Sequence, residues 1–205
     1  AGGRPPGGRL IVKSVWEHGS LGLSDDSVCE PRDGGALLAL LGTRGPALGG
    51  EAFAEAYVHG REFNLSVLEV DGAPEVLPAA EIRFEVHPGG RPRVIGYAAK
   101  WDEASPDWHG TPRTFDLPGS DAPLVARLAE LSRACWHAFG LSGYARVDFR
   151  VDESARPFVL EINANPCLAP DAGFAAALAR SGRSFEDGVA LLLDAALRRA
   201  GGSDA

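Results

Sequence analysis

Residues 144–151 alternate between polar and apolar side chains, a pattern typical of a β-strand with one buried face. Arg146, Asp148 and Arg150 share one face, and the apolar residues between them share the other. A turn at residues 152–157 leads into a second predicted strand at residues 158–163, so the two segments form an antiparallel hairpin. Such a hairpin needs further elements to cover its apolar face, which favours a packed globular domain.

The polar face of this hairpin concentrates groups that can do chemistry. Glu161 and Asn163 are predicted to share it with Arg146 and Asp148. We expect the apolar residues of the second strand on the opposite face: Phe158, Leu160 and Ile162. Two neighbouring carboxylates repel each other, and a divalent cation with oxygen ligands would relieve that repulsion. The pattern predicts a Mg²⁺ site at Asp148, Glu161 and Asn163, with a solvated outer face as the alternative.

Elsewhere, predicted strand pairs outnumber helices that could connect parallel strands. Strands are expected at residues 10–12, 52–58, 63–70, 73–77 and 94–101. Helices are expected from Asp33 to Leu41 with Gly42 as the stop, from Asp121 to Phe139, at residues 171–179, and after a capping box at Ser184 and Asp187. Residues 102–117 are expected to form a long mobile loop. These elements indicate an α+β fold with a largely antiparallel sheet.

The charge balance narrows the function classes. The net charge is −8 and the pI is about 5.1, which argues against nucleic acid or an anionic membrane as the main partner. The three cysteines are scattered, as in a reduced cytoplasmic protein. Only two of the 20 basic side chains are lysines, Lys13 and Lys100. Either they survive by chance, or these positions need a compact ammonium group.

Five motifs carry a resemblance to a known family. In chain order they are residues 13–22 (KSVWEHGSLG), 55–62 (EAYVHGRE), 96–101 (GYAAKW), 143–148 (GYARVD) and 161–166 (EINANP). Their order resembles that of ATP-grasp ligases, in particular the D-alanine–D-alanine ligase type. The resemblance implies an ATP-grasp fold of two α/β lobes with largely antiparallel sheets. We expect a flexible lead-in at residues 1–9, a partial small lobe at 10–60 and a large lobe with the metal site at 61–205. The family's N-terminal domain is expected to be absent, so the chain would be the later part of a longer enzyme.

The resemblance also implies roles for individual residues. The nucleotide-binding residues would be Lys13, Glu17, Gly19, Glu55, Tyr57, Val58, Glu62, Lys100 and Trp101. Within this set the two lysines would face the phosphates, Glu55 the adenine amino group and Glu62 the ribose hydroxyls. The catalytic residues would be Arg146, Lys100 and Ser20, with one or two Mg²⁺ ions on Asp148, Glu161 and Asn163. Residues 16–22 and 102–117 would close over the site.

The activity implied is an ATP-dependent carboxylate–amine ligation. A carboxylate would attack the γ-phosphate of ATP, and an amine would displace phosphate from the acyl phosphate to give an amide. The expected partners are small carboxylates and amines, in the cytoplasm, with a homodimer left open. Cys167 and the lack of serine at residues 169–173 depart from the family pattern and leave the acceptor undefined. A catalytically silent nucleotide-binding module, or part of a larger ATP-grasp enzyme with a different acceptor, is the alternative.

Overall fold

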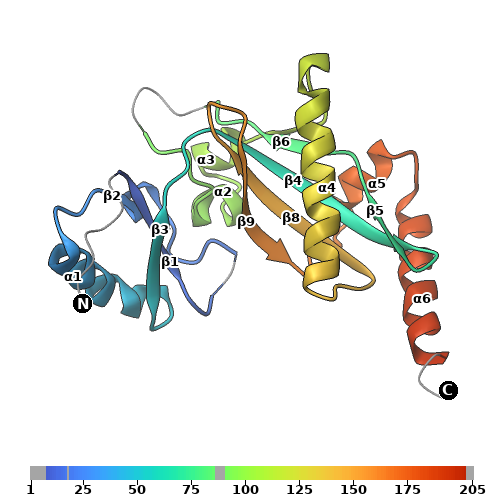
Figure 1. Cartoon of the computed structure of the whole chain (residues 1–205), viewed down its shortest axis with the longest axis horizontal. Helices are drawn as coiled ribbons and strands as arrows, with labels where there is room; N and C mark the ends of the chain where they lie inside the picture. Colours follow the sequence, from blue (N-terminus) through green and yellow to red (C-terminus); the bar gives the residue numbers. More distant parts are fainter. Residues whose placement is uncertain (1–7, 18, 86–90, 202–205) are drawn as a thin grey trace. The chain divides into compact units, whose positions relative to one another are not determined.

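A computed structural model describes residues 8–17, 19–85 and 91–201 (Figure 1). The chain divides into two compact units, here called unit 1 (Ala1–His59 and Arg83–Pro112) and unit 2 (Gly60–Ile82 and Arg113–Ala205). Residues 83–112, which the sequence analysis placed with the C-terminal lobe, therefore group with unit 1. Most of the expected lead-in, residues 1–7, lies outside the described residues.

Unit 1 contains a three-stranded antiparallel sheet in the order β2-β1-β3. Its strands are β1 (Leu10–Ser14), β2 (Val28–Cys29) and β3 (Ala52–Ala56). Its helices are η1 (Asp25–Ser27), α1 (Gly34–Arg44), η2 (Gly45–Leu48), α2 (Tyr97–Trp101) and α3 (Pro106–His109). The Asp33 carboxylate accepts a hydrogen bond from the Ala36 N–H at 2.7 Å, so the predicted cap of α1 is confirmed.

Three expectations for unit 1 and its flank are wrong. Helix α1 does not stop at Gly42 but continues to Arg44, because one glycine inside a helix costs only about 1 kcal/mol. The expected strand at 94–101 is replaced by α2, whose short run of helix formers outweighs the apolar pattern. The expected loop at 102–117 contains α3, started by the Ser105 cap and Pro106, and the short strand β7 (Arg113–Thr114).

Unit 2 is built on a six-stranded sheet in which every pairing is antiparallel. The strand order is β7-β6-β4-β8-β9, with β5 pairing with the far end of β4. The remaining strands are β4 (Arg61–Val70), β5 (Ala73–Val76), β6 (Ala80–Ile82), β8 (Tyr144–Val151) and β9 (Pro157–Asn163). Its helices are η3 (Gly119–Asp121), α4 (Ala122–Ala138), α5 (Gly173–Arg180) and α6 (Phe185–Gly201). The α+β class and the antiparallel sheets are thus confirmed.

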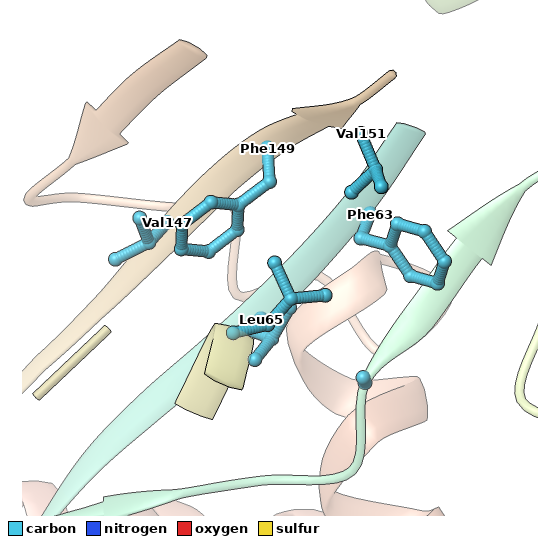
Figure 2. Packing of buried hydrophobic residues seen from close by; sticks show 7 residues of the cluster. Phe63, Leu65, Val147, Phe149 and Val151 are labelled. Atoms are coloured by element: carbon cyan, nitrogen blue, oxygen red, sulfur yellow. The ribbon is translucent and has the colours of Figure 1, made fainter. Parts of the chain in front are cut away.

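The core of unit 2 lies between α4 and one face of the sheet. The alternating apolar residues of β4 and β8 supply it, as Figure 2 shows for Phe63, Leu65, Val147, Phe149 and Val151. Each of these is at most 1% exposed, as is Leu128 on α4, which packs against them. Burial of a side chain of this size contributes about 1.5–3 kcal/mol. The hairpin therefore gains its position in the sheet mainly from this apolar face.

The opposite face of the sheet is covered at one end by α5 and α6. Phe174 and Leu178 of α5 pack on Leu68 at the end of β4. The predicted capping box of α6 is confirmed, since Ser184 and Asp187 exchange backbone–side-chain hydrogen bonds of 3.0 and 3.1 Å. Among the described residues, every helix is too short or too polar to span a bilayer.

The hairpin differs from its expected form at one position. Strands β8 and β9 are in register from Arg146 opposite Asn163 to Asp148 opposite Glu161, and a bulge then leaves Leu160 without a partner. Phe158 therefore lies opposite Arg150 and shares the polar face, which corrects its expected orientation. The bulge inverts the alternation beyond Leu160 and leaves the polar end of the hairpin as predicted.

Candidate functional site

The face of the unit 2 sheet opposite α4 carries polar residues on each of three adjacent strands. Strand pairing places these residues side by side: Glu62, Asn64 and Ser66 on β4, Arg146, Asp148 and Arg150 on β8, and Glu161 and Asn163 on β9. We call this set the polar face. Asp148 is only 4% exposed, and Glu62 and Arg150 are each 6% exposed. The alternative of a solvated outer face is therefore contradicted at its centre.

The strongest contact on the polar face joins Arg146 to Asp148. Nε and Nη2 of Arg146 donate to the two oxygens of Asp148, both at 2.7 Å, which is a bidentate charge-assisted pair. Burial alone would lower the pKa of Arg146, but the charge and hydrogen bonds of Asp148, together with Glu161 and Glu62, outweigh it and raise the pKa. Arg146 therefore already neutralises one of these carboxylates, so Asp148 does not need a bound cation to be buried.

The oxygen atoms here are of the kind that could act as ligands of a divalent cation. A carboxylate has about four lone-pair sites, so the two hydrogen bonds from Arg146 leave lone pairs of Asp148 available to a further ligand. Glu161 lies directly across the strand pair from Asp148, and Asn163 adds an amide oxygen two residues further along. Within the described residues no three His, Cys, Asp or Glu side chains gather closely enough to hold a metal by themselves. Mg²⁺, which takes few carboxylates and completes its shell with phosphates and water, suits this donor set.

Glu62, the expected ribose ligand, is held by a second arginine. Its carboxylate pairs with Arg150 at 3.1 Å, and both side chains are less than a tenth exposed. Arg150 also donates to the carbonyl of Gly60 at 3.4 Å. Gly60 has a φ of +151°, and a Cβ there would lie 1.9 Å from the carbonyl oxygen of Val151. Only glycine fits at this position directly before β4, one residue away from Arg61 and two from Glu62.

In unit 1, the structure brings together Lys13 and Glu55. They stand on neighbouring strands of the same sheet, and their side chains form an ion pair. The Lys13 side chain is 17% exposed and that of Glu55 is 42% exposed, so the pair is open to water on the glutamate side. Binding of a phosphate by Lys13 and of an adenine by Glu55 would each have to compete with this pair.

The glycine-containing loop and α2 meet within unit 1. The indole N–H of Trp101 donates to the carbonyl of Gly19 at 2.9 Å, and the Ser20 hydroxyl donates to the carbonyl of Ile95 at 2.7 Å. Gly19 and Ser20 have φ values of +70° and +66°, so the loop makes a tight left-handed turn here. Lys100, on α2, has no ion pair or hydrogen bond to another side chain in the described part of the chain. Residue 18, a loop histidine, lies outside the described residues.

The other expected nucleotide residues of unit 1 are also anchored. The Tyr57 hydroxyl accepts from the Arg93 N–H at 2.7 Å, and the guanidinium of Arg9 lies 5.2 Å from the centre of its ring. Val58 follows at the end of this segment and is half-buried. The Glu17 backbone N–H donates to the Ser14 hydroxyl at 2.8 Å, which holds the start of the glycine loop against β1.

The sequence-predicted site residues thus form two groups. Unit 1 holds Lys13, Glu17, Gly19, Ser20, Glu55, Tyr57, Val58, Lys100 and Trp101, and unit 2 holds Glu62, Arg146, Asp148, Glu161 and Asn163. Sequence reasoning missed Asn64 and Ser66 on β4, although polar residues at every second position of a strand were the signal for them. It also missed Arg113, because a two-residue strand gives no periodic signal.

Comparisons with known proteins agree with this architecture. A family model described as D-ala D-ala ligase C-terminus matches residues 10–194. The chain is 30% identical over 190 residues to the uncharacterized protein y4sG of Sinorhizobium fredii, covering 93% of this chain and 52% of the relative. It is 32% identical over 186 residues to a D-alanine–D-alanine ligase of Chromohalobacter salexigens, covering 90% of this chain and 52% of that protein. The chain therefore spans about half the length of these relatives.

Solved structures give the same result. A D-alanine–D-alanine ligase of Bacillus anthracis superposes with a TM-score of 0.70 at 25% identity, covering 96% of this chain and 57% of that one. The structure of a ligase of that name and organism complexed with ATP superposes with a TM-score of 0.68 at 21% identity, covering 96% and 55% of the two chains. The second likeness concerns the fold alone.

Proposed function

The chain belongs to the family described as D-ala D-ala ligase C-terminus, and from this premise we propose that it carries the ATP-dependent part of a carboxylate–amine ligase. The reaction would activate a carboxylate as an acyl phosphate and transfer it to an amine, releasing ADP and phosphate. The cofactors would be ATP and one or two Mg²⁺ ions. The acid and the amine would be small molecules, and the location would be the cytoplasm.

One observation carries this proposal: the arrangement of Arg146, Asp148, Glu161 and Asn163 on the polar face. Carboxylates are seldom buried unless they are paired or bind a metal. Here the buried Asp148, paired with Arg146, stands beside the half-buried Glu161, which forms no ion pair within the described residues. Such a group of oxygens beside a guanidinium suits a reaction in which negative charge moves between phosphate and carboxyl oxygens. Asp148, Glu161 and Asn163 would hold Mg²⁺, which when bound would neutralise negative charge on the phosphate oxygens.

The residues of the chain would then divide the work. Arg146, fixed in direction by its two bonds to Asp148, would donate to the oxygens of the acyl phosphate and of the tetrahedral intermediate formed by the amine. Glu62, oriented by Arg150, would accept from the ribose hydroxyls. Lys13 and Lys100 would bind phosphate oxygens, and Glu55 the adenine amino group, once the ion pair between Lys13 and Glu55 is exchanged for the nucleotide. Ser20, which lies on the glycine loop, would be a further catalytic residue.

A binding module without catalysis is the second candidate. The buried pair of Arg146 and Asp148 favours the enzyme, since a module that only holds a nucleotide gains little from a buried charge pair. Phosphate release distinguishes the two candidates.

The first experiment measures whether MgATP stabilises the protein. At a ligand concentration one hundred times Kd, binding adds about 2.7 kcal/mol, which for a chain of this size raises Tm by about 5–10 °C. Asp148→Asn combined with Glu161→Gln should abolish most of that rise. The matched control is Glu153→Gln combined with Asp194→Asn, which removes the same two charges from exposed positions in unit 2 and should leave the rise intact. An unchanged Tm of the wild type with MgATP would contradict the proposal.

The second experiment measures phosphate release from ATP against pooled amino acids. The ligase predicts release only when a carboxylate and an amine are both present, with an amide product visible by mass spectrometry. Release in the absence of both would indicate an ATPase. Stabilisation by MgATP without release under any condition would favour the binding module.

A further inference from the structure

Arg113 extends the polar face of unit 2 by one more charged residue. It lies on the edge strand β7, opposite Ile82 of β6. Ile82 pairs with Glu62 of β4, and Glu62 pairs with Arg150 of β8. Residues paired across antiparallel strands project to the same side of the sheet. Arg113 therefore projects to the same side as Glu62 and Arg150.

Arg113 differs from the other two arginines on this face because it has no acidic partner. Arg146 is paired with Asp148 and Arg150 with Glu62, whereas in the part of the chain that the structure describes Arg113 makes no ion pair and no side-chain hydrogen bond. Arg113 is exposed to solvent as a residue, while partial desolvation of its guanidinium and the positive charge of Arg146 both lower its pKa. Among the described residues, the three other arginines with a resolved change have a raised pKa, namely Arg61, Arg91 and Arg146.

The guanidinium of Arg113 is held close to the backbone at the start of α5. A Cβ at Gly173 would lie 3.3 Å from Nη2, 3.4 Å from Cζ and 3.5 Å from Nε of Arg113. The absence of a side chain at Gly173 therefore makes room for the guanidinium.

We propose that Arg113 is a substrate-binding residue that takes a carboxylate group of the acceptor in a bidentate hydrogen-bonded pair. Asp148 is already bonded to Arg146, and no acidic side chain in the described part of the chain bonds to Arg113, although the charges of Arg113 and Arg146 interact. An anionic ligand near Arg113 would therefore meet a guanidinium whose hydrogen-bond donors are not taken by an acid. The planar fork of arginine fits a carboxylate in two parallel bonds. This inference rests on the proposed function for the identity of the ligand as an acceptor, and its anion chemistry can be tested without ATP.

The test is a titration of the ¹⁵N-labelled protein followed by NMR at the Nε–Hε group of Arg113, assigned through its loss in Arg113→Gln. Acetate is the carboxylate probe, acetamide is its neutral counterpart, and inorganic phosphate is the second oxyanion. Chloride at matched ionic strength reports unspecific screening. We expect a saturable shift with acetate, no shift with acetamide, and affinity for phosphate weaker than for acetate.

Two variants make the result specific. Arg113→Gln should weaken acetate binding about tenfold or more, measured at the neighbouring Gly173 amide, because a charged hydrogen-bond pair is lost. Arg133→Gln removes an exposed arginine of α4 and should leave acetate binding unchanged. A response to acetate no larger than that to chloride would overturn the proposal, and tighter binding of phosphate than of acetate would overturn the carboxylate assignment. Failure of the ligase proposal would appear separately, as the absence of stabilisation by MgATP.

Discussion

The pair of Arg146 and Asp148 makes a quantitative prediction about stability without ligand. Asp148→Asn keeps the size of the side chain but leaves the Arg146 charge without its partner in a largely buried place. Breaking a fully buried pair in this way costs about 3–5 kcal/mol. The Arg146 side chain is 21% exposed and its partner 6%, so part of the lost attraction is recovered from water. We therefore expect a loss of about 2–3 kcal/mol in the free energy of unfolding of unit 2, or about 4–12 °C in Tm.

The measurement should follow unit 2 alone, because the chain has two compact units. Hydrogen exchange of the β8 amides along a urea series reports the opening of this sheet. Glu161→Gln is the matched comparison, and it should cost less than about 1 kcal/mol because no hydrogen bond to its carboxylate is formed within the described residues.

A double-mutant cycle isolates the interaction. Arg146→Met alone should also destabilise unit 2, because it leaves the Asp148 carboxylate buried without a partner. The double variant, which removes both charges, should be more stable than the sum of the two losses predicts. A change of less than 0.5 kcal/mol for Asp148→Asn, or additive losses in the cycle, would refute the view that this pair compensates the charges of the polar face.

Three further predictions test other parts of the structure. Lys100→Arg should lower the rate of phosphate release at saturating substrate while Tm stays within about 2 °C, because a guanidinium fork does not replace a compact ammonium. Full activity of this variant would show that position 100 does not need a lysine. Gly60→Ala should destabilise unit 2 by more than about 2 kcal/mol, since a Cβ would lie 1.9 Å from the Val151 carbonyl oxygen; Gly72→Ala, with nothing near its Cβ position, serves as the control with the same sign of φ. Hydrogen bonds from Arg61 hold the pKa of Asp121 below its ordinary value of 3.8. The contribution of Asp121 to stability is therefore present above that pH and is lost as the pH falls through its lower folded-state pKa. Asp121→Asn should make Tm fall less steeply at acid pH, and an unchanged fall of Tm would show that Asp121 does not contribute.

The central hairpin could be predicted well because its determinants, the alternation of side chains and the turn between the strands, are local in sequence. Strict alternation at residues 144–151 follows directly from one buried and one partly polar face, and both faces are present in the structure. The bulge at Leu160 could not be predicted, because it changes the partner of each later residue without changing the composition of the strand. Helix α6 was found through its capping box, which is also a local signal.

The errors arise where distant residues decide the structure. Asp121 occupies the predicted start of α4, yet its carboxylate binds Arg61, 60 positions away, and does not cap the helix. Residues 94–101 have the apolar content of a strand, but the structure forms a helix there. Arg113 was assigned to a loop, and only the pairing of β6 with β7 brings it to the polar face. For Asp121 and Arg113 the deciding contact is between segments far apart in sequence, which a pattern in one window does not contain.

The order in which the chain visits its two units limits how this protein can be dissected. Unit 1 consists of two stretches of sequence, one ending at His59 and the other at residues 83–112, and Gly60–Ile82 of unit 2 lies between them in the sequence. The backbone N–H of Tyr97 bonds to the carbonyl of Leu23, so a recombinant fragment that starts at residue 60 would lose that acceptor. Shuffling or swapping of unit 1 between relatives therefore has to exchange two stretches of the gene together. A single crossover at residue 60 would take the two partners of the Gly19–Trp101 and Ser20–Ile95 hydrogen bonds from different parent proteins.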